Sequence, residues 1–161
     1  MQDVGRAQST AEAELAGVRE NQERIAKGKP PLDGPAAALK RVLANAGVDA
    51  TPVCDLVRVD DPEWQPAIES YLGVSNMQAL LVDQADERQA FRVSRQAGVY
   101  EAKVVMPSKF SNRSSPRRGA VAELISGNST AAVNYLRSKF GDTQRAETED
   151  ECFAHPVVGH R

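Results

Sequence analysis

The sequence is poor in the residues that build disulfide-rich, membrane-spanning or strongly charged proteins. Only Cys54 and Cys152 are cysteines among 161 residues, too few for a small domain held by disulfides and typical of a reducing compartment. No apolar run approaches the roughly 20 residues that cross a bilayer, and the start MQDVGRAQST lacks the pattern of a signal peptide. The net charge of −2 gives no general attraction to nucleic acid or anionic membranes. We expect a soluble cytoplasmic protein.

Motifs for catalysis, cofactors and metals are also absent. No Gly-Lys-Ser/Thr follows a four-residue gap, so a nucleotide-hydrolysing P-loop is excluded. Cys152, His155 and His160 lie close together but lack the second half of a zinc motif. The segment GNST, Gly127 to Thr130, is either a plain helix cap or a place where free amides hold an anion. We predict no catalytic residue, no metal and no cofactor.

The chain begins with a long helical pattern. Ser9 and Glu12 have the spacing of a capping box, and Gly28 ends the pattern. Between them, one stripe of mainly apolar residues repeats every four and then three positions: Ala11, Leu15, Val18, Gln22 and Ile25. This is the period of a coiled-coil seam, but two to three heptads also fit an ordinary amphipathic helix packed on its own domain.

After the linker KGKPPLDGP, the pattern predicts an α/β (α+β) domain with a small mixed sheet and flanking helices. The chain has 41% hydrophobic residues, enough for one globular core. Cys54 is expected to be a small buried hydrophobe in its strand, and Trp64 and Tyr71 are expected to pack in the core. The expected helices are Pro35–Ala46, Asp61–Gly73, Gln84–Gln96 and Ser129–Gly141, and the expected strands are Val53–Val59, Ala79–Val82, Glu101–Met106, Ala120–Ile125 and Thr143–Ala146.

A basic, acid-free segment surrounds the loop PSKFSNRSSPRRG. Its bases are Lys103, Lys109, Arg113, Arg117 and Arg118. Arg and Lys neutralise phosphates and the intervening Ser and Asn can position them, which favours contact with a DNA backbone. A solvated loop without a ligand is the alternative, and the acidic stretch from Glu147 to Glu151 is a further candidate partner for it.

The ordered motifs CDLVRVDDPEWQPAIESYLG, ALLVD, VYEAKVV, SPRRGAVAELI and NYLRSKFGD resemble the hinge of SMC-like proteins of the MukB and Wadjet type. The resemblance covers roughly residues 31 to 152. It implies that residues 1–29 are the end of a coiled-coil arm, 30–153 a homodimerising hinge, and 154–161 a tail leading toward a returning arm. It also implies a parent ATPase with distant heads, other SMC-complex subunits, association with the nucleoid or a plasmid, and a role in chromosome organisation or plasmid defence.

In that setting we expect two copies to pair through an exposed sheet edge, the glycine-bracketed strand with Gly119, Val121, Leu124 and Gly127. The rival interpretation is a small α/β ligand-binding or enzymatic domain that holds a phosphate at GNST and is monomeric. A protein-interaction adaptor with a helical tether is a third.

Overall fold

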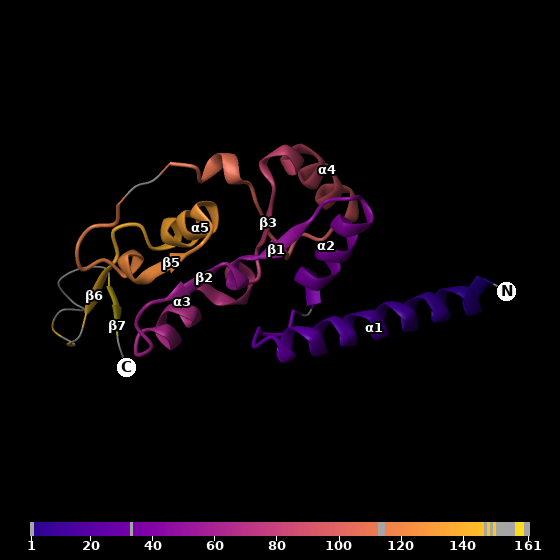
Figure 1. Cartoon of the computed structure of the whole chain (residues 1–161), viewed down its shortest axis with the longest axis horizontal. Coiled ribbons are helices and arrows are strands. Elements are labelled where there is room, and N and C mark those ends of the chain that lie inside the picture. Colours follow the sequence, from indigo (N-terminus) through magenta and orange to yellow (C-terminus); the bar gives the residue numbers. More distant parts are fainter. Residues whose placement is uncertain are drawn as a thin grey trace.

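The computed structural model describes residues 2–32, 34–112, 115–146, 148, 150 and 157–159. A long helix, α1 (Gln2–Ala26), extends beside an elongated α/β body (Figure 1). The predicted start of this helix at Ser9 is wrong, because residues from Gln2 onward are already helical and the Thr10 hydroxyl donates to the Arg6 carbonyl inside the helix at 2.8 Å. The predicted end is confirmed, with Gly28 at φ 73°. The mixed α/β class with small sheets and flanking helices is confirmed as well.

One half of the body is built on a three-stranded sheet with the order β1-β3-β4. Strands β1 (Ala50–Pro52) and β3 (Leu80–Val82) are antiparallel, whereas β4 (Val104–Val105) is parallel to β3. Helices α2 (Gly34–Asn45) and α4 (Glu87–Ala97) pack together on it, the latter preceded by the 3-10 turn η2 (Gln84–Asp86). The core of this half consists of Leu39, Leu43, Val48, Ala50, Leu80, Val82 and Ala90.

The predicted central strand Val53–Val59 is wrong. Its residues form the 3-10 turn η1 (Val53–Asp55) and a separate strand β2 (Val57–Val59), which belongs to another sheet. The ladder with the β3 side ends at Val53, whose N–H donates to the Ala79 carbonyl at 2.8 Å, and Leu56 N–H then closes the turn on the Val53 carbonyl at 2.9 Å. The chain therefore crosses from one half of the body to the other at η1.

The second half contains a two-stranded antiparallel sheet of β2 and β5 (Ile125–Gly127) between α3 (Gln65–Met77) and α5 (Thr130–Phe140). The Ser129 side chain caps α5 by accepting the Ala132 amide at 3.3 Å, as predicted. The main buried side chains of this half are Val53, Trp64, Ile68, Leu72, Val121, Ile125, Val133, Tyr135, Leu136 and Phe140. Tyr71, predicted to be in the core, is 54% exposed, although its ring stacks on that of Phe140.

The predicted strand Ala120–Ile125 is also wrong. Val121–Leu124 forms a 3-10 turn, η4, and the strand β5 begins only at Ile125. Val121, Ala122 and Ile125 are all buried, and that spacing cannot lie on one face of a strand, where alternate residues point the same way. The turn is fixed to the next segment, since Val121 N–H donates to the Thr143 carbonyl at 2.9 Å.

The predicted edge strand near residue 144 is confirmed as β6 (Gln144–Ala146), which pairs in parallel with β7 (Val157–Gly159). Cys152, His155 and His160, weighed above as metal ligands, lie outside the described residues. Within the described part of the chain, no helix is long and apolar enough to cross a membrane.

Candidate functional site: the arm junction and an open strand edge

Helix α1 contacts the body with its polar face. Along this face, Ala13, Gly17, Glu20 and Asn21 are half-buried and Arg24 is buried. The apolar stripe lies on the other side, with Leu15, Val18 and Ile25 at 59%, 54% and 61% exposure. The interpretation of α1 as an amphipathic helix packed on its own domain through that stripe is therefore wrong. The stripe with coiled-coil spacing is left open to a partner.

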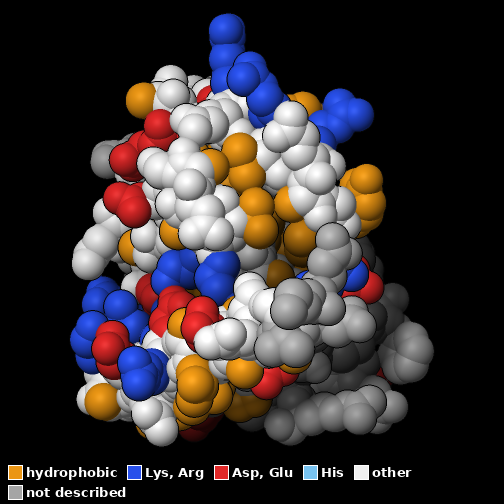
Figure 2. Space-filling model, turned by 90° about the vertical axis from the view of Figure 1, so that its right-hand side faces the viewer, with side chains coloured by type: hydrophobic (Ala, Val, Ile, Leu, Met, Phe, Trp, Pro, Cys, Tyr) orange, Lys and Arg blue, Asp and Glu red, His pale blue; other side chains and the backbone are white. Residues whose placement is uncertain are grey.

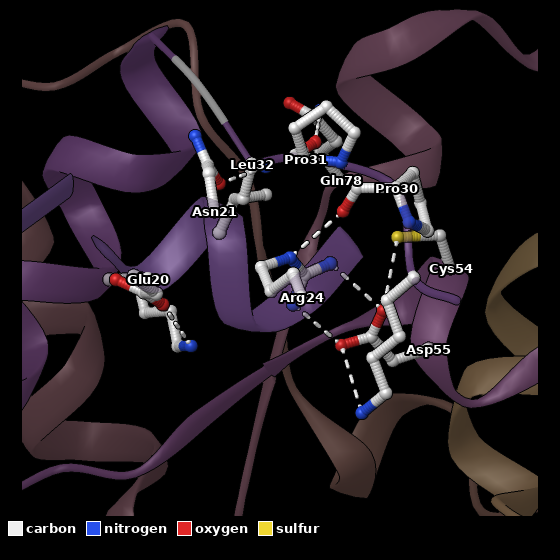
Figure 3. Close-up of polar contacts among 11 residues, drawn as sticks. Glu20, Asn21, Arg24, Pro30, Pro31, Leu32, Cys54, Asp55 and Gln78 are labelled. Atoms are coloured by element: carbon white, nitrogen blue, oxygen red, sulfur yellow. Dashed lines mark hydrogen bonds and ion pairs between the residues drawn. The ribbon is translucent and has the colours of Figure 1, made fainter. Parts of the chain in front are cut away.

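Arg24 fixes the end of α1 to the turn between the two halves of the body (Figure 3). Its two terminal nitrogens donate to the two Asp55 carboxylate oxygens at 2.8 and 2.9 Å, and its Nε donates to the Pro30 carbonyl at 2.9 Å. The side chains of Arg24 and Asp55 are 8% and 4% exposed. Burial opposes the charge of the guanidinium, but its hydrogen bonds and attraction to Asp55 prevail and raise the pKa of Arg24.

Further polar contacts hold α1 along the same face. The Leu32 amide donates to the Asn21 side chain at 2.8 Å (Figure 3), and Lys40 pairs with Glu20 at 2.8 Å. Earlier in α1, Arg41 of α2 donates to the Ala13 carbonyl at 3.3 Å. A bidentate Arg–carboxylate pair has a defined geometry, so these contacts together set the direction in which α1 leaves the body.

Cys54 lies beside this junction in η1 rather than in a strand, and it is half-buried. Burial, followed by the nearby Asp55 charge, raises the pKa of the Cys54 thiol to about 11. The thiol is therefore protonated at neutral pH, and its environment is that of an unreactive cysteine.

The outer edge of β2 opens on a groove. Asp60 N–H donates to the Leu124 carbonyl at 2.8 Å and Arg58 lies opposite Ser126. Because antiparallel pairing alternates, the backbone groups of Val57 and Val59 point away from β5, and no hydrogen bond joins them to any residue that the structure describes. The groove has a volume of about 420 Å³ and lies between this edge and α3, with Ile68, Leu72, Val74 and Met77 in its lining.

The structure does not gather the predicted basic residues into one patch of free charge. Lys103 donates to the Asn76 side chain at 2.8 Å. Arg117 pairs with Asp142 at 3.7 Å, and both side chains are more than 70% exposed. Arg118 is exposed, and Arg113 lies outside the described residues.

The loop itself is attached to α5. Lys109 lines a cavity of about 380 Å³ that also contains Asn134 and Asp142. The Asn134 amide donates to the carbonyls of Phe110 and Asn112 at 2.8 and 3.0 Å. The Phe110 ring packs edge-on against Tyr135 and is therefore committed to the protein interior rather than to a base.

The four predicted interface residues do not share one strand: Val121 and Leu124 lie in η4, Gly127 lies in β5, and Gly119 lies in the turn before η4. Val121 is completely buried and Leu124 is half-buried in η4, so the Val121 side chain is not presented at a sheet edge. Gly119 has φ 84°. Gly127 allows close approach of the chain's own backbone, since a Cβ there would lie 2.1 Å from the Leu56 carbonyl oxygen.

Sequence reasoning missed the Arg24–Asp55 pair. A signal existed in the spacing of Ala13, Gly17, Glu20 and Arg24, which repeats every four, three and four residues on the face opposite the apolar stripe. Small and polar residues at that spacing indicate close helix contact, but the partner Asp55 is 31 positions away and has no local pattern.

Comparisons with known proteins give a structural likeness only. No family model matches the sequence, and none of the curated proteins does. The solved structures that share the fold include three of SMC hinge domains. The Pyrococcus furiosus SMC hinge domain has a TM-score of 0.55 at 18% identity over 91% of this chain and 76% of its own. The same hinge with an extended coiled coil has 0.55 at 18% over 92% and 53%. An asymmetric dimer of the Geobacillus stearothermophilus SMC hinge domain has 0.58 at 17% over 94% and 64%.

Proposed function

We propose that this chain is the self-associating hinge of an SMC-like protein, of the MukB and Wadjet type, and that α1 is the end of a coiled-coil arm. The observation that carries the proposal is the division of α1 into two faces, one fixed to the body by Arg24 and one exposing Leu15, Val18 and Ile25. A coiled-coil arm needs both faces, because one must hold the helix to the body while the apolar stripe stays free to pack against another helix. The likeness to SMC hinge domains supports the same conclusion.

We propose that self-association occurs through the open edge of β2 and the neighbouring surface of α3. This surface takes the place of residues 119–127, the segment expected from the sequence, because the Val121 side chain is buried. Val57 and Val59 have backbone groups ready for pairing, and Val74 on α3 is 70% exposed. An unpaired edge beside an apolar surface is the usual setting for strand addition between chains. A closed dimer would use this surface twice.

Sedimentation equilibrium tests this assignment. The unmodified chain should form a dimer, and Val74→Asp should shift it to monomer because the new carboxylate would be buried at the interface. Val18→Asp is the matched control, since it introduces the same charge on the exposed stripe of α1, and it should leave the dimer intact. A monomer at high concentration for the unmodified chain contradicts the hinge proposal itself. If the Val74→Asp variant remains a dimer, the interface lies elsewhere on the surface.

Contact with DNA is the second part of the proposal, within a complex that organises chromosomes or acts against plasmids. It depends on the basic loop, where Arg117 and Arg118 are exposed. Replacing Arg113, Arg117 and Arg118 with Gln should weaken duplex binding at low salt. It should also reduce the slope of log K against log salt by about 0.9 for each phosphate that the variant no longer neutralises. The same slope in the variant would remove the loop from the proposal.

No observation favours the rival phosphate site. The Ser129 hydroxyl already accepts the Ala132 amide at the start of α5, which is the arrangement of an ordinary helix cap.

A further inference from the structure

One face of α4 carries a basic surface that the proposed function does not use. Arg88, Phe91, Arg92 and Arg95 are all exposed, and their spacing of three, one and three residues places them on the same side of the helix. The opposite side holds the buried Ala90. Lys and Arg side chains gather at the top of the surface in Figure 2, at the level where α4 lies in Figure 1. We call these four residues the α4 basic face.

The three arginines have no acidic partner in the described part of the chain. Within the residues that the structure describes, no carboxylate forms an ion pair with Arg88, Arg92 or Arg95. The nearest acid in sequence, Glu87, accepts instead from the Ser108 amide and hydroxyl. Arg95 lies over the Phe91 ring, with its guanidinium carbon 5.6 Å from the ring centre.

Helix electrostatics explain only part of this arrangement. A cation in the last turn, such as Arg95, is favoured by the helix dipole. Arg88, however, is the second residue of α4, where the positive end of the dipole disfavours a cation. Phe91 is 49% exposed at the centre of the face. Arg88 is thus a cation in an unfavourable position on the same face as the exposed Phe91 ring. This arrangement is expected of a surface whose charges are neutralised when another molecule binds.

The dimensions of the face indicate the chemistry of that partner. Arg88 and Arg95 are seven positions apart, or about 10 Å along the helix. Acids flank the stretch in sequence, with Asp83 and Asp86 before it and Glu101 after it. A long polyanion such as duplex DNA would meet these acids, whereas a short segment would not. The planar fork of arginine matches a carboxylate in geometry, and Phe91 offers an apolar contact between the charges.

We propose that the α4 basic face binds a short acidic segment of a partner protein, with carboxylates three or four residues apart around an apolar residue. This interaction goes beyond the proposed hinge function and does not depend on self-association, because neither α1 nor the β2 edge contributes to it.

The test measures fluorescence anisotropy of a labelled helical peptide of about 15 residues, or four turns. The peptide has Glu at positions i, i+4 and i+7 and Leu at i+3, in an Ala and Gln background. Exposed ion pairs contribute about 0.2–1 kcal/mol each, so replacing the three arginines with Gln should weaken binding by about 3- to 150-fold. Phe91→Ala should weaken it further. Melting temperatures verify that each variant is folded.

Two controls separate this interaction from general charge attraction. The first removes three exposed positive charges elsewhere, with Arg6, Arg19 and Lys27 replaced by Gln, and should leave peptide binding within about twofold, since exposed charges beyond a Debye length are screened. The second is the same peptide with Gln in place of Glu, which should not bind.

Three outcomes would overturn the proposal. These are equal loss of binding in the control triple variant, unchanged binding after removal of Arg88, Arg92 and Arg95, or displacement of the peptide by a duplex of about 20 base pairs that binds more tightly through the same arginines. The last result would assign the face to nucleic acid instead.

Discussion

Removing the Asp55 carboxylate should strongly destabilise the chain and release the end of α1. In Asp55→Ala, Arg24 keeps only its bond to the Pro30 carbonyl and becomes a buried cation without a counter-ion. Breaking one partner of a buried pair costs about 3–5 kcal/mol. The lower end applies here, because Arg24 lies on a helix at the surface of the body and can turn toward water. We expect the free energy of unfolding to fall by about 3 kcal/mol.

Lys29 provides an internal comparison. Its ammonium lies 3.8 Å from Asp55 but its side chain is 45% exposed, so Lys29→Ala should cost less than about 1 kcal/mol. Replacing both members of the main pair, as Arg24→Met with Asp55→Leu, removes two buried charges together. That double variant should be much closer to the unmodified chain than either single change, since no unpaired charge is left behind.

Urea unfolding followed by circular dichroism gives the stabilities. Distances between spin labels on α1 and α5, in a background with the native cysteines replaced, report the direction of α1. The Asp55→Ala distribution should broaden, while that of Lys29→Ala should not. If Asp55→Ala lowers the free energy of unfolding by less than about 1 kcal/mol, the value of an exposed pair, the Arg24–Asp55 pair does not fix the end of α1 to the body.

The remaining predictions concern local packing and titration. Gly127→Ala should cost about 3 kcal/mol or prevent folding, because its Cβ would collide with the Leu56 carbonyl, whereas Gly17→Ala, whose Cβ meets only an arginine end at 3.6 Å, should be neutral or stabilise α1 by up to about 1 kcal/mol; thermal melts compare the two. Because the pKa of Cys54 rises from 9.0 to about 11 on folding, unfolding free energy should be unaffected below pH 9.0 and fall as pH rises toward 11, and the alkylation rate should still increase across that interval; a rate that levels off near pH 9.0 contradicts this. The last change replaces the three exposed residues of the α1 stripe, Leu15, Val18 and Ile25, with Gln. The free energy of unfolding should change by less than about 0.5 kcal/mol, and a larger loss would mean that the stripe is packed against the body.

Features set by local chemistry were predictable from the sequence. Ser129 caps α5, Gly28 and Gly47 follow the ends of α1 and α2 at positive φ, and the short apolar run Leu80–Val82 is the strand β3. Each depends on the preferences of a few adjacent residues. Of the predicted functional surfaces, the apolar stripe on α1 was found in the same way, because heptad spacing is visible without knowledge of the fold.

Features that depend on distant contacts were not predictable. The run Val53–Val59 has the composition of one strand, yet only Val57–Val59 is a strand. Val53–Asp55 forms the turn η1 instead, because the chain leaves β1, which pairs with β3, and enters β2, which pairs with β5 far along the chain. Ala120–Ile125 is equally apolar, and only packing against the body selects a 3-10 turn. The pairing of Arg24 with Asp55 and the open edge of β2 required the fold itself.

The position of Asp55 has a mechanical consequence. The carboxylate lies in the turn that passes directly from β1 of one sheet to β2 of the other, and the end of α1 is tied to it. A pull or twist applied along α1 would be passed to α2 through Lys40 and Arg41 and to the boundary of the two cores through Asp55. It would therefore act on how the two halves are oriented. The same connection runs in reverse, and a reorientation of the halves would swing the distant tip of α1.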